Sequence, residues 1–265
     1  LSANLGDDHN LDGHLLPGLD PRGVPQHLQG TVFPFQYNCF DELESLAAQH
    51  PDIGVIKMEV SRNFGPENNF LEKVRELATS HGIVLIFDEC TSGFRETFGG
   101  LHKLYGVEPD MAMFGKALGN GYAITAVIGR REIMEAAQKT FISSTFWTER
   151  IGPTAALATL EEMKRVKSWE IITSQGEKIQ EGWKKLAIEN DLELKCAGIP
   201  ALSTYSIETE NWLKYKTFIT QEMLKKGWLA GSSVYVCIDH TDSVIENYLN
   251  ELNPIFKTIS DFEKS

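Results

Sequence analysis

Apolar residues in the first half of the chain follow two spacings in turn. Residues 53–60 and 83–89 form short apolar runs that are typical of strands. Between them, residues 68–82 repeat apolar positions every three or four residues and end at Gly82, which is typical of a helix and its stop. This succession predicts a β-α-β unit. Because such units carry parallel strands covered by helices, the pattern indicates an α/β fold with a mostly parallel sheet and flanking helices.

The same alternation continues and then changes character. Residues 110–115 and 124–129 predict two more strands of the layer, and residues 150–166 predict a helix. After that helix, the predicted elements are a polar helix over 169–190, strands over 192–198 and 201–208, a helix over 212–226, a strand over 234–238 and a helix from Asp242. Short strands mixed with helices indicate a smaller α+β unit. We therefore expect two domains, residues 1–166 and 167–265.

The opening stretch is rich in Gly, Pro, Asp and His, and it predicts an irregular loop before a strand near residues 31–35. Residues 8–19 imitate a calcium-binding loop. However, Leu19 stands where that pattern requires a bidentate glutamate. We therefore interpret His9 and His14 as loop residues, and no metal site is expected.

Charge and cysteine content narrow the classes of partner. The chain has 25 Lys+Arg against 37 Asp+Glu, a formal charge of -12, and no basic run that would favour nucleic acid or an anionic membrane. No apolar stretch approaches the roughly 18 residues of a membrane span. Cys39, Cys90, Cys196 and Cys237 form no C-x-x-C pair, which favours reduced thiols and a cytoplasmic protein.

A single lysine separates an apolar strand from a glycine-rich turn in "AMFGKALGNG", residues 112–121. Ligands of parallel sheets bind outside the carboxyl ends of the strands, where residues 83–89 place Asp88 and the next strand places Lys116. A carboxylate and an amine in one crevice suit pyridoxal 5'-phosphate, which needs a lysine for a Schiff base and an acid to keep its ring nitrogen protonated. Burial would favour the neutral, nucleophilic lysine. A solvated surface lysine and an aspartate that caps a turn are the alternatives, and spacing alone leaves them open.

Longer stretches carry a family resemblance. "LIFDECTSGFR", "GVEPDMAMFGKALGNGYAITAVIGRREIM" and "SSTFWTERIGPTAALATLEEM", in that order and at those separations, resemble the large domain of class III aminotransferases. The likeness is greatest to the branch that contains glutamate-1-semialdehyde 2,1-aminomutase, and "VYVCIDHTDSVIENYLNEL" is similar to the family's C-terminal domain. The resemblance implies the fold-type I architecture of enzymes that use pyridoxal phosphate, with a homodimer whose active sites lie at the subunit interface. Residues 1–166 would then be the remainder of the cofactor-binding domain.

The resemblance also assigns roles residue by residue. Lys116 matches the lysine that binds the cofactor covalently, and Asp88 matches the partner of the ring nitrogen. Cys90 matches an aliphatic residue that packs on the ring. Thr145 matches the threonine that reaches the phosphate from the neighbouring subunit, and Glu59 matches a glutamate near the substrate side.

The chain departs from the family pattern at several positions. The family's Glu-Pro pair is Glu59-Val60 here, the valine after Asp-Glu is Cys90, and a stretch that reads T-x-S-G-N-P is "TFWTERI". These differences favour a relative with a different amine acceptor. Family members also carry an upstream Ser/Gly-rich turn for the phosphate and an aromatic residue that stacks on the ring, and neither has a match in this chain.

The sequence therefore predicts transfer of an amino group, by an aminotransferase or an aminomutase, with pyridoxal phosphate as cofactor. The expected partners are a small amine donor, a carbonyl acceptor and a second copy of the chain. Lys116 would act as cofactor anchor and general base, and Asp88 would stabilise the protonated ring. The alternatives are another reaction on the same cofactor, such as racemisation, and a non-catalytic fragment without the phosphate-binding part of the site.

Overall fold

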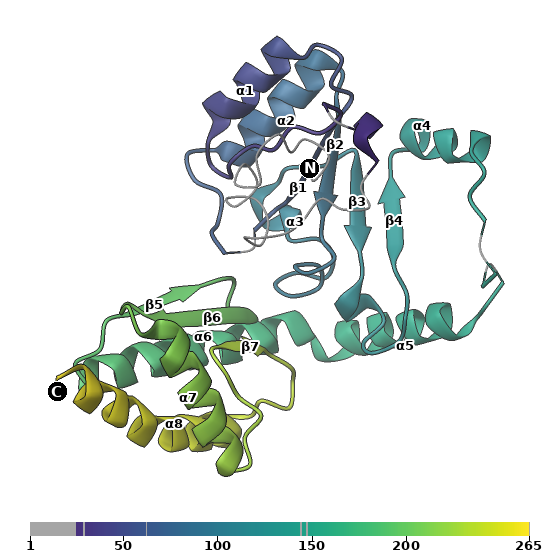
Figure 1. Cartoon of the computed structure of the whole chain (residues 1–265). Coiled ribbons are helices and arrows are strands. Elements are labelled where there is room, and N and C mark those ends of the chain that lie inside the picture. Colours follow the sequence, from purple (N-terminus) through teal and green to yellow (C-terminus); the bar gives the residue numbers. More distant parts are fainter. Residues whose placement is uncertain (1–24, 29, 62, 144, 147, 265) are drawn as a thin grey trace. The chain divides into compact units, whose positions relative to one another are not determined.

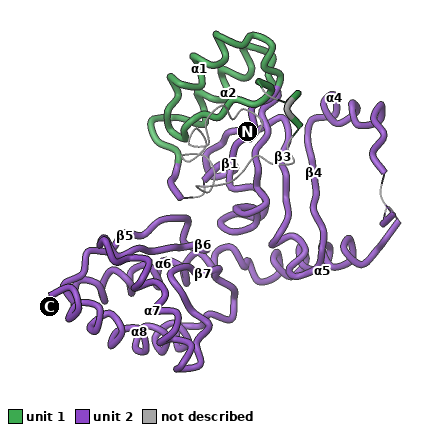
Figure 2. Tube along the Cα trace, in the orientation of Figure 1, with its two compact units in different colours: residues 1–54, 66–83 green, residues 55–65, 84–265 purple. Residues whose placement is uncertain are grey.

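The computed structural model describes most of the chain as two compact units. The described residues are 25–28, 30–61, 63–143, 145–146 and 148–264. The smaller unit comprises the described parts of Leu1–Gly54 and Pro66–Ile83, and the larger comprises those of Val55–Gly65 and Val84–Ser265 (Figure 2). The domain boundary expected at residue 166 lies inside the larger unit and stays a prediction. The calcium-like loop with His9 and His14 lies outside the described residues.

The smaller unit differs from the sequence-based expectation at its start. It contains a 3-10 turn, η2 (Gln26–Leu28), and two helices, α1 (Phe40–Gln49) and α2 (Phe70–His81). The strand expected near residues 31–35 is wrong, because this segment has no regular secondary structure. Pro34 has no N–H group that could donate a hydrogen bond to a neighbouring strand. The Phe33 ring stacks on His50, with ring centroids 4.0 Å apart.

Helix α2 confirms the periodicity of the sequence. Its buried residues are Phe70, Leu71, Val74, Leu77 and Ala78. The helix ends at Gly82, whose φ of +67° lies in the left-handed region that glycine adopts without a Cβ penalty, and whose N–H donates to the carbonyls of Ala78 and Thr79. The short helix α1 was not expected from the sequence, and it buries Leu43 and Ala47 on one face.

The larger unit holds two sheets. Its elements are, in chain order, β1 (Val55–Glu59), β2 (Val84–Asp88), α3 (His102–Tyr105), β3 (Met111–Phe114), η3 (Lys116–Leu118), β4 (Ala126–Gly129), α4 (Arg131–Met134), η4 (Glu135–Lys139), α5 (Ile151–Val166), α6 (Ser168–Glu189), β5 (Leu194–Ala197), β6 (Leu202–Ile207), α7 (Trp212–Lys225), β7 (Ser233–Tyr235) and α8 (Asp242–Glu263). Each strand and helix that we expected from residue 53 onward is therefore present, with ends shifted by a few residues.

The first sheet confirms the expected α/β architecture. Strands β1 to β4 lie side by side in that order (Figure 1). Strand β2 pairs in parallel with both β1 and β3, whereas β4 is antiparallel to β3. The register sets Glu59 opposite Asp88, and Asp88 opposite Met113. The carboxyl ends of the three parallel strands therefore share one edge of the sheet.

A small apolar cluster fixes the segment that follows β3. Phe114, at the end of β3, packs with Leu118 of η3 and with Ala156 of α5. Between them, Gly115 is extended and leads directly into η3. Because the residues before and after Lys116 are anchored in this cluster, the lysine occupies a defined place at the end of the strand.

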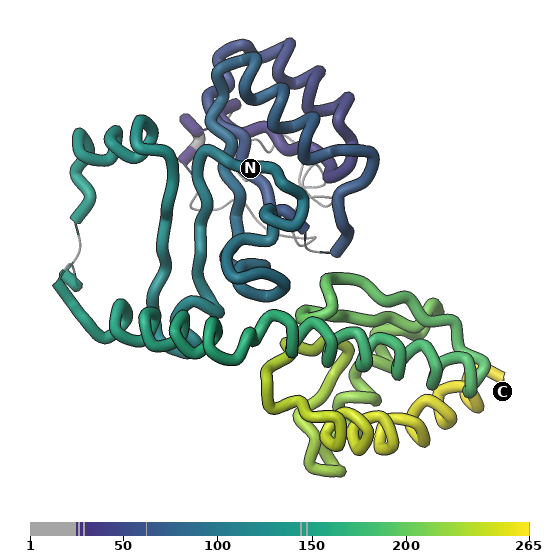
Figure 3. The backbone as a smooth tube through the Cα atoms, turned by 180° about the vertical axis from the view of Figure 1, so that it is seen from behind, coloured from purple at the N-terminus to yellow at the C-terminus, as the bar shows by residue number. Residues whose placement is uncertain are grey.

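The C-terminal part of the larger unit has its own core around the antiparallel sheet β5–β6–β7. Figure 3 shows α6 following α5 along the chain, with α8 running beside α6. The core rings include Trp183 and Phe256, whose centroids lie 4.6 Å and 5.8 Å from that of Tyr205. Although α6 and α8 are long, none of the helices in the described part of the chain is apolar enough to cross a membrane.

Candidate active site

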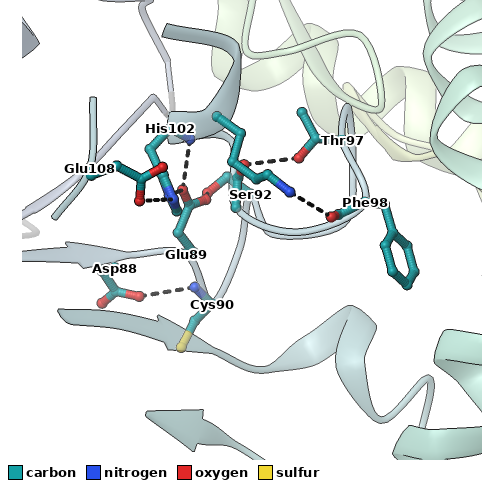
Figure 4. A network of polar contacts seen from close by, with 10 residues as sticks. Asp88, Glu89, Cys90, Ser92, Thr97, Phe98, His102 and Glu108 are labelled. Atoms are coloured by element: carbon teal, nitrogen blue, oxygen red, sulfur yellow. Dashed lines mark hydrogen bonds and ion pairs between the residues drawn. The ribbon is translucent and has the colours of Figure 1, made fainter. Parts of the chain in front are cut away.

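Asp88 stands at the carboxyl end of β2 and has both carboxylate oxygens engaged. Its Oδ2 lies 2.7 Å from Nζ of Lys57 on the neighbouring strand. Its Oδ1 accepts a hydrogen bond of 3.1 Å from the backbone N–H of Cys90 (Figure 4). Burial raises the pKa of Asp88, but the hydrogen bonds from Lys57 and Cys90 outweigh burial and leave that pKa below its ordinary value. The carboxylate is therefore ionised at neutral pH.

Lys116 follows the carboxyl end of β3 after a single glycine. The sequence suggested that this lysine is buried, but the structure shows it exposed. Its Nζ donates a hydrogen bond of 2.6 Å to Oγ1 of Thr91. Its backbone has a φ of +41°, in the left-handed region that a residue with a Cβ adopts at a cost of about 1 kcal/mol. Strain of this kind clusters at functional sites, which makes the lysine a candidate functional residue.

Cys90 follows Asp88 by two residues, and its sulfur lies close to the backbone just before Lys116. A Cβ placed on Gly115, the residue before Lys116, would stand 3.5 Å from the Cys90 sulfur. Burial and the Asp88 carboxylate raise the pKa of the Cys90 thiol, whereas Lys116 and Lys57 lower it. The Cys90 thiol is therefore close enough to Asp88, Lys116 and Lys57 for their charges to affect its pKa. The structure therefore brings Asp88, Cys90 and Lys116 together at one edge of the sheet, as we expected.

Glu59 and Thr145 complete the set of residues assigned from the sequence. Glu59 is half-buried at the end of β1 and is directly opposite Asp88 in the parallel register. Thr145 lies in an exposed turn. The roles of both residues stay predictions, because a position in the sheet or in a turn does not identify a ligand.

Two residues at the site were not found by sequence reasoning. Lys57 and Thr91 are the partners of Asp88 and Lys116 respectively. The period of a strand places Lys57 and Glu59 on one face. However, the strand register that brings Lys57 to Asp88 is not readable from one sequence. Thr91 follows Cys90 in an irregular segment, whose path has no periodic signal.

A buried polar network holds the segment after β2 in place. Glu89 is 0% exposed, and its carboxylate accepts hydrogen bonds from Oγ of Ser92 at 2.5 Å and from the backbone N–H of His102 at 3.0 Å (Figure 4). Its Oε1 also lies 2.9 Å from Nδ1 of His102. The opposite ring nitrogen, Nε2, is 3.9 Å from the exposed carboxylate of Glu108. The network therefore joins both ends of the segment that carries Cys90.

A cavity of about 490 Å³ opens beside Lys116. Its lining includes Phe94, Arg95, Ser168 and Tyr235, which come from the segment after β2, the start of α6 and the end of β7. A cavity of this volume accommodates a small organic ligand. The lysine therefore lines a space in which a substrate can bind.

An ionised carboxylate and an amine thus stand at the ends of two adjacent parallel strands, and the amine also lines a cavity. The family model of class-III aminotransferases matches residues 38–241, and the chain belongs to that family. This finding confirms the resemblance seen in the sequence.

Curated relatives agree with the family assignment. The 3-aminobutyryl-CoA aminotransferase of Cloacimonas acidaminovorans is 33% identical over 236 residues, which cover 83% of this chain and 56% of that protein. The glutamate-1-semialdehyde 2,1-aminomutase of Sulfurihydrogenibium sp. is 27% identical over 260 residues, covering 90% of this chain and 61% of the relative. The chain thus spans less than two thirds of the length of these relatives.

Solved structures show the same fold. The FumI protein of Sphingopyxis sp. MTA144 superposes with a TM-score of 0.82 at 22% identity, over 88% of this chain and 59% of that chain. An omega-transaminase from Sphaerobacter thermophilus gives a TM-score of 0.80 at 20% identity, over 89% and 59% of the two chains. The expected fold-type I architecture is therefore confirmed.

Proposed function

We propose that the protein transfers an amino group from an amine donor to a carbonyl acceptor with pyridoxal phosphate as cofactor. The arrangement of Asp88, Cys90 and Lys116 at the carboxyl ends of adjacent parallel strands carries the proposal. The donor set fits the cofactor, because it offers an amine for the aldehyde, an ionised acid for the ring nitrogen and a thiol nearby. When bound, pyridoxal phosphate supplies the aldehyde that takes up the amino group and a ring that withdraws electrons.

Each residue then has a separate task. Lys116 would hold the cofactor through Nζ and, once released, accept and return the proton of the substrate carbon. The Thr91 hydroxyl orients that nitrogen at 2.6 Å. Asp88 would hold the proton of the ring nitrogen, and the Cys90 side chain would pack against the ring. Glu59, opposite Asp88 in the sheet, would face the substrate side.

Lys57, on β1, and Lys116, which follows β3, allow a direct test of which lysine binds the cofactor. Borohydride treatment of the protein loaded with pyridoxal phosphate is expected to fix a pyridoxyl group on Lys116, located by peptide mass spectrometry. Lys57 is the internal control, because its Nζ lies only 2.7 Å from the Asp88 carboxylate. A label on Lys57, or on any lysine other than Lys116, contradicts the proposal.

The charge of Asp88 is tested separately. Asp88→Asn keeps the shape of the side chain but removes the charge, and we expect at least a hundredfold loss of amino transfer, about the loss caused by removing one preorganised electrostatic contact. Asp52→Asn, in an exposed turn, is the matched control. Near-normal transfer by Asp88→Asn would mean that the carboxylate only caps the strand.

We further propose a cytoplasmic homodimer in which Thr145 reaches the phosphate bound by the partner subunit. The free cysteines among the described residues agree with a reducing compartment. Mixing Lys116→Arg subunits with Thr145→Val subunits is expected to restore about a quarter of the activity, because half the dimers are mixed and each has one intact site. Absence of recovery, in dimers shown by mass spectrometry to be mixed, contradicts the shared site.

A further inference from the structure

The turn between β7 and α8 carries a cysteine and a histidine that have no role in the site described above. Cys237 and His240 are three positions apart, and the backbone N–H of His240 donates to the carbonyl of Cys237 at 3.1 Å. Val236, just before the turn, is 1% exposed, and its N–H donates to the carbonyl of Ala201 at 3.0 Å. Thr241, just after the turn, is the N-cap residue of α8. The turn is therefore anchored at both ends.

One ring nitrogen of His240 is directed at the thiol of Cys237. The backbone N–H of Cys237 donates to Nδ1 of His240 at 2.9 Å, so this nitrogen carries a lone pair rather than a proton. The Cys237 sulfur lies 3.3 Å from the same nitrogen, within hydrogen-bonding range for sulfur. If Nδ1 takes up the thiol proton, it can in turn donate to the Cys237 carbonyl, which is also 3.3 Å away. The imidazole is thus placed to act as a base for the thiol.

The thiol can be reached from the cavity beside Lys116. Cys237 is exposed, and it lines the same cavity of about 490 Å³ as Lys116. Ile238 follows in the lining, and its carbonyl accepts from Nε2 of Gln175 on α6 at 3.4 Å. A molecule that enters the cavity therefore meets the Cys237 side chain on a fixed part of the wall.

The other three cysteines lack this combination of exposure and a basic partner. Cys90 and Cys196 are half-buried, and burial raises the pKa of both thiols, which disfavours the nucleophilic thiolate. Cys39 is exposed, but no histidine bonds to its sulfur within the described residues. Cys237 is therefore the cysteine whose surroundings favour reaction with an electrophile.

We propose that Cys237 is a modification site, at which the thiol exchanges with low-molecular-weight disulfides and His240 acts as the base. The Cys237 sulfur attacks one sulfur of the disulfide and forms a new S–S bond, while the thiol proton passes to Nδ1 of His240. The original S–S bond breaks, and the departing thiolate takes up that proton. Cys237 is thereby oxidised to a mixed disulfide, and the other half of the reagent is reduced to a thiol.

A bulky adduct on Cys237 occupies part of the cavity that Lys116 also lines. Modification would therefore hinder the entry of a substrate. This consequence rests on the proposed function, because it takes that cavity as the substrate site. The reactivity of the thiol does not rest on it, and the two are measured separately.

Glutathione disulfide is the probe of reactivity, and peptide mass spectrometry measures the rate at each cysteine of the protein. We expect Cys237 to react at least about tenfold faster than Cys39, because both are exposed and only Cys237 has a base. In urea, where the turn is lost, the two rates are expected to agree within about twofold. Equal rates in the folded protein, or faster modification of another cysteine, would overturn the proposal without the need for any variant.

A substitution of the base tests its role. His240→Asn keeps an oxygen that accepts from a backbone N–H but cannot take up the thiol proton, so we expect modification of Cys237 to slow at least about tenfold. The rate at Cys39 in the same sample is expected to stay unchanged. His81→Asn, at an exposed histidine at the end of α2, is the matched control and is expected to leave both rates unchanged. An unchanged rate at Cys237 in His240→Asn contradicts the role of the imidazole.

The size of the adduct tests the effect on the cavity. The glutathione adduct is expected to lower amino transfer at least about tenfold, and dithiothreitol, which removes it, is expected to restore the activity. Methyl methanethiosulfonate leaves only a methylthio group on the sulfur, and we expect a change within about twofold. Cys237→Ser is expected to lose the sensitivity to glutathione disulfide. Full activity of the glutathione adduct would refute the obstruction of the cavity, whereas failure of Lys116 to carry the borohydride label refutes the proposed function and leaves the rates at Cys237 as an independent result.

Discussion

The sharpest stability test is Glu89→Gln, at the centre of the network that holds the segment after β2. The Glu89 carboxylate accepts from Ser92 Oγ, from the backbone N–H of His102 and from Nδ1 of the same histidine, at 2.5, 3.0 and 2.9 Å (Figure 4). Glutamine has one acceptor oxygen, and its NH₂ group cannot accept from a donor. The glutamine oxygen can still accept from His102, and its NH₂ group can donate to Ser92 Oγ once that hydroxyl turns to accept, but all of these bonds lose the charge of the carboxylate.

The magnitude follows from the number and burial of these bonds. A hydrogen bond to a charged group contributes about 1.5–3 kcal/mol, and one between neutral groups contributes about 0.5–1.5 kcal/mol. Each of the three bonds therefore loses about 1 kcal/mol, and we expect a loss of about 3 kcal/mol in the free energy of unfolding. For a unit of this size, that loss lowers the melting temperature by about 6–12 °C.

The pH dependence of Glu89 has a definite sign. Burial raises the pKa of this carboxyl, but hydrogen bonds from His102 and Ser92 outweigh burial and place the pKa below its ordinary value. A depressed folded-state pKa means that Glu89 stabilises the fold above the ordinary pKa of glutamate, and that this contribution is lost as pH falls through the folded-state value. The difference between the parent and Glu89→Gln is therefore expected to be constant near pH 7 and to shrink below about pH 4.

Equilibrium unfolding in urea, followed by tryptophan fluorescence and circular dichroism, measures the effect. Glu108→Gln is the matched control, because its carboxylate is 3.9 Å from the other nitrogen of His102 but is 82% exposed. Such a pair contributes at most about 1 kcal/mol. If Glu89→Gln unfolds within about 0.5 kcal/mol of the parent, the network does not stabilise the segment and the reasoning is refuted.

Three further substitutions test other contacts. Lys57→Met removes the ammonium group that would compete with the cofactor ring nitrogen for Asp88. Because the ion pair of about 0.4–1 kcal/mol need no longer be broken, titration by absorbance is expected to show two- to fivefold tighter pyridoxal phosphate binding. Weaker binding would contradict this competition for Asp88. Tyr248→Phe deprives Trp183 Nε1 of its acceptor at 2.9 Å and is expected to cost about 1–3 kcal/mol in urea unfolding, whereas unchanged stability would contradict this. Gly119→Ala places a Cβ against a backbone carbonyl of the turn after η3. The free energy of unfolding is expected to fall by about 1–3 kcal/mol, and the affinity for the cofactor is expected to fall as well. Wild-type stability together with wild-type cofactor affinity would show that the turn adjusts to the Cβ.

The elements that were predicted correctly are those with strong apolar periodicity. Helix α2 and strand β2 carry uninterrupted patterns and were both expected. Helix α1 was missed, because Cys39 precedes it without a capping hydrogen bond and only ten residues carry its pattern. The antiparallel direction of β4 was not predicted, although the short connection 115–125 leaves no room for a crossover helix.

Candidate site residues could be proposed from the sequence only where a chemically suitable side chain stands at the end of a strand. Asp88 and Lys116 were identifiable because a carboxylate and a lysine end two successive apolar strands. Their partners depend on strand register and on the path of an irregular segment. Arg95 and Ser168 are 73 positions apart, and only the fold places them in one cavity. Residue type therefore suggested candidate reactive groups, whereas the residues that surround them could be identified only from coordinates.

The partners of the two lysines explain how one site can keep one amine fixed and the other available. Lys57 is bound to Asp88 in an ion pair, and moving its Nζ away separates opposite charges. Nζ of Lys116 bonds to the neutral hydroxyl of Thr91, and the described part of the chain places no carboxylate within 4.0 Å of it. It can therefore leave its partner without breaking an ion pair. Its backbone is also strained at a φ of +41°, and such strain agrees with the proposed role of this lysine in the chemistry.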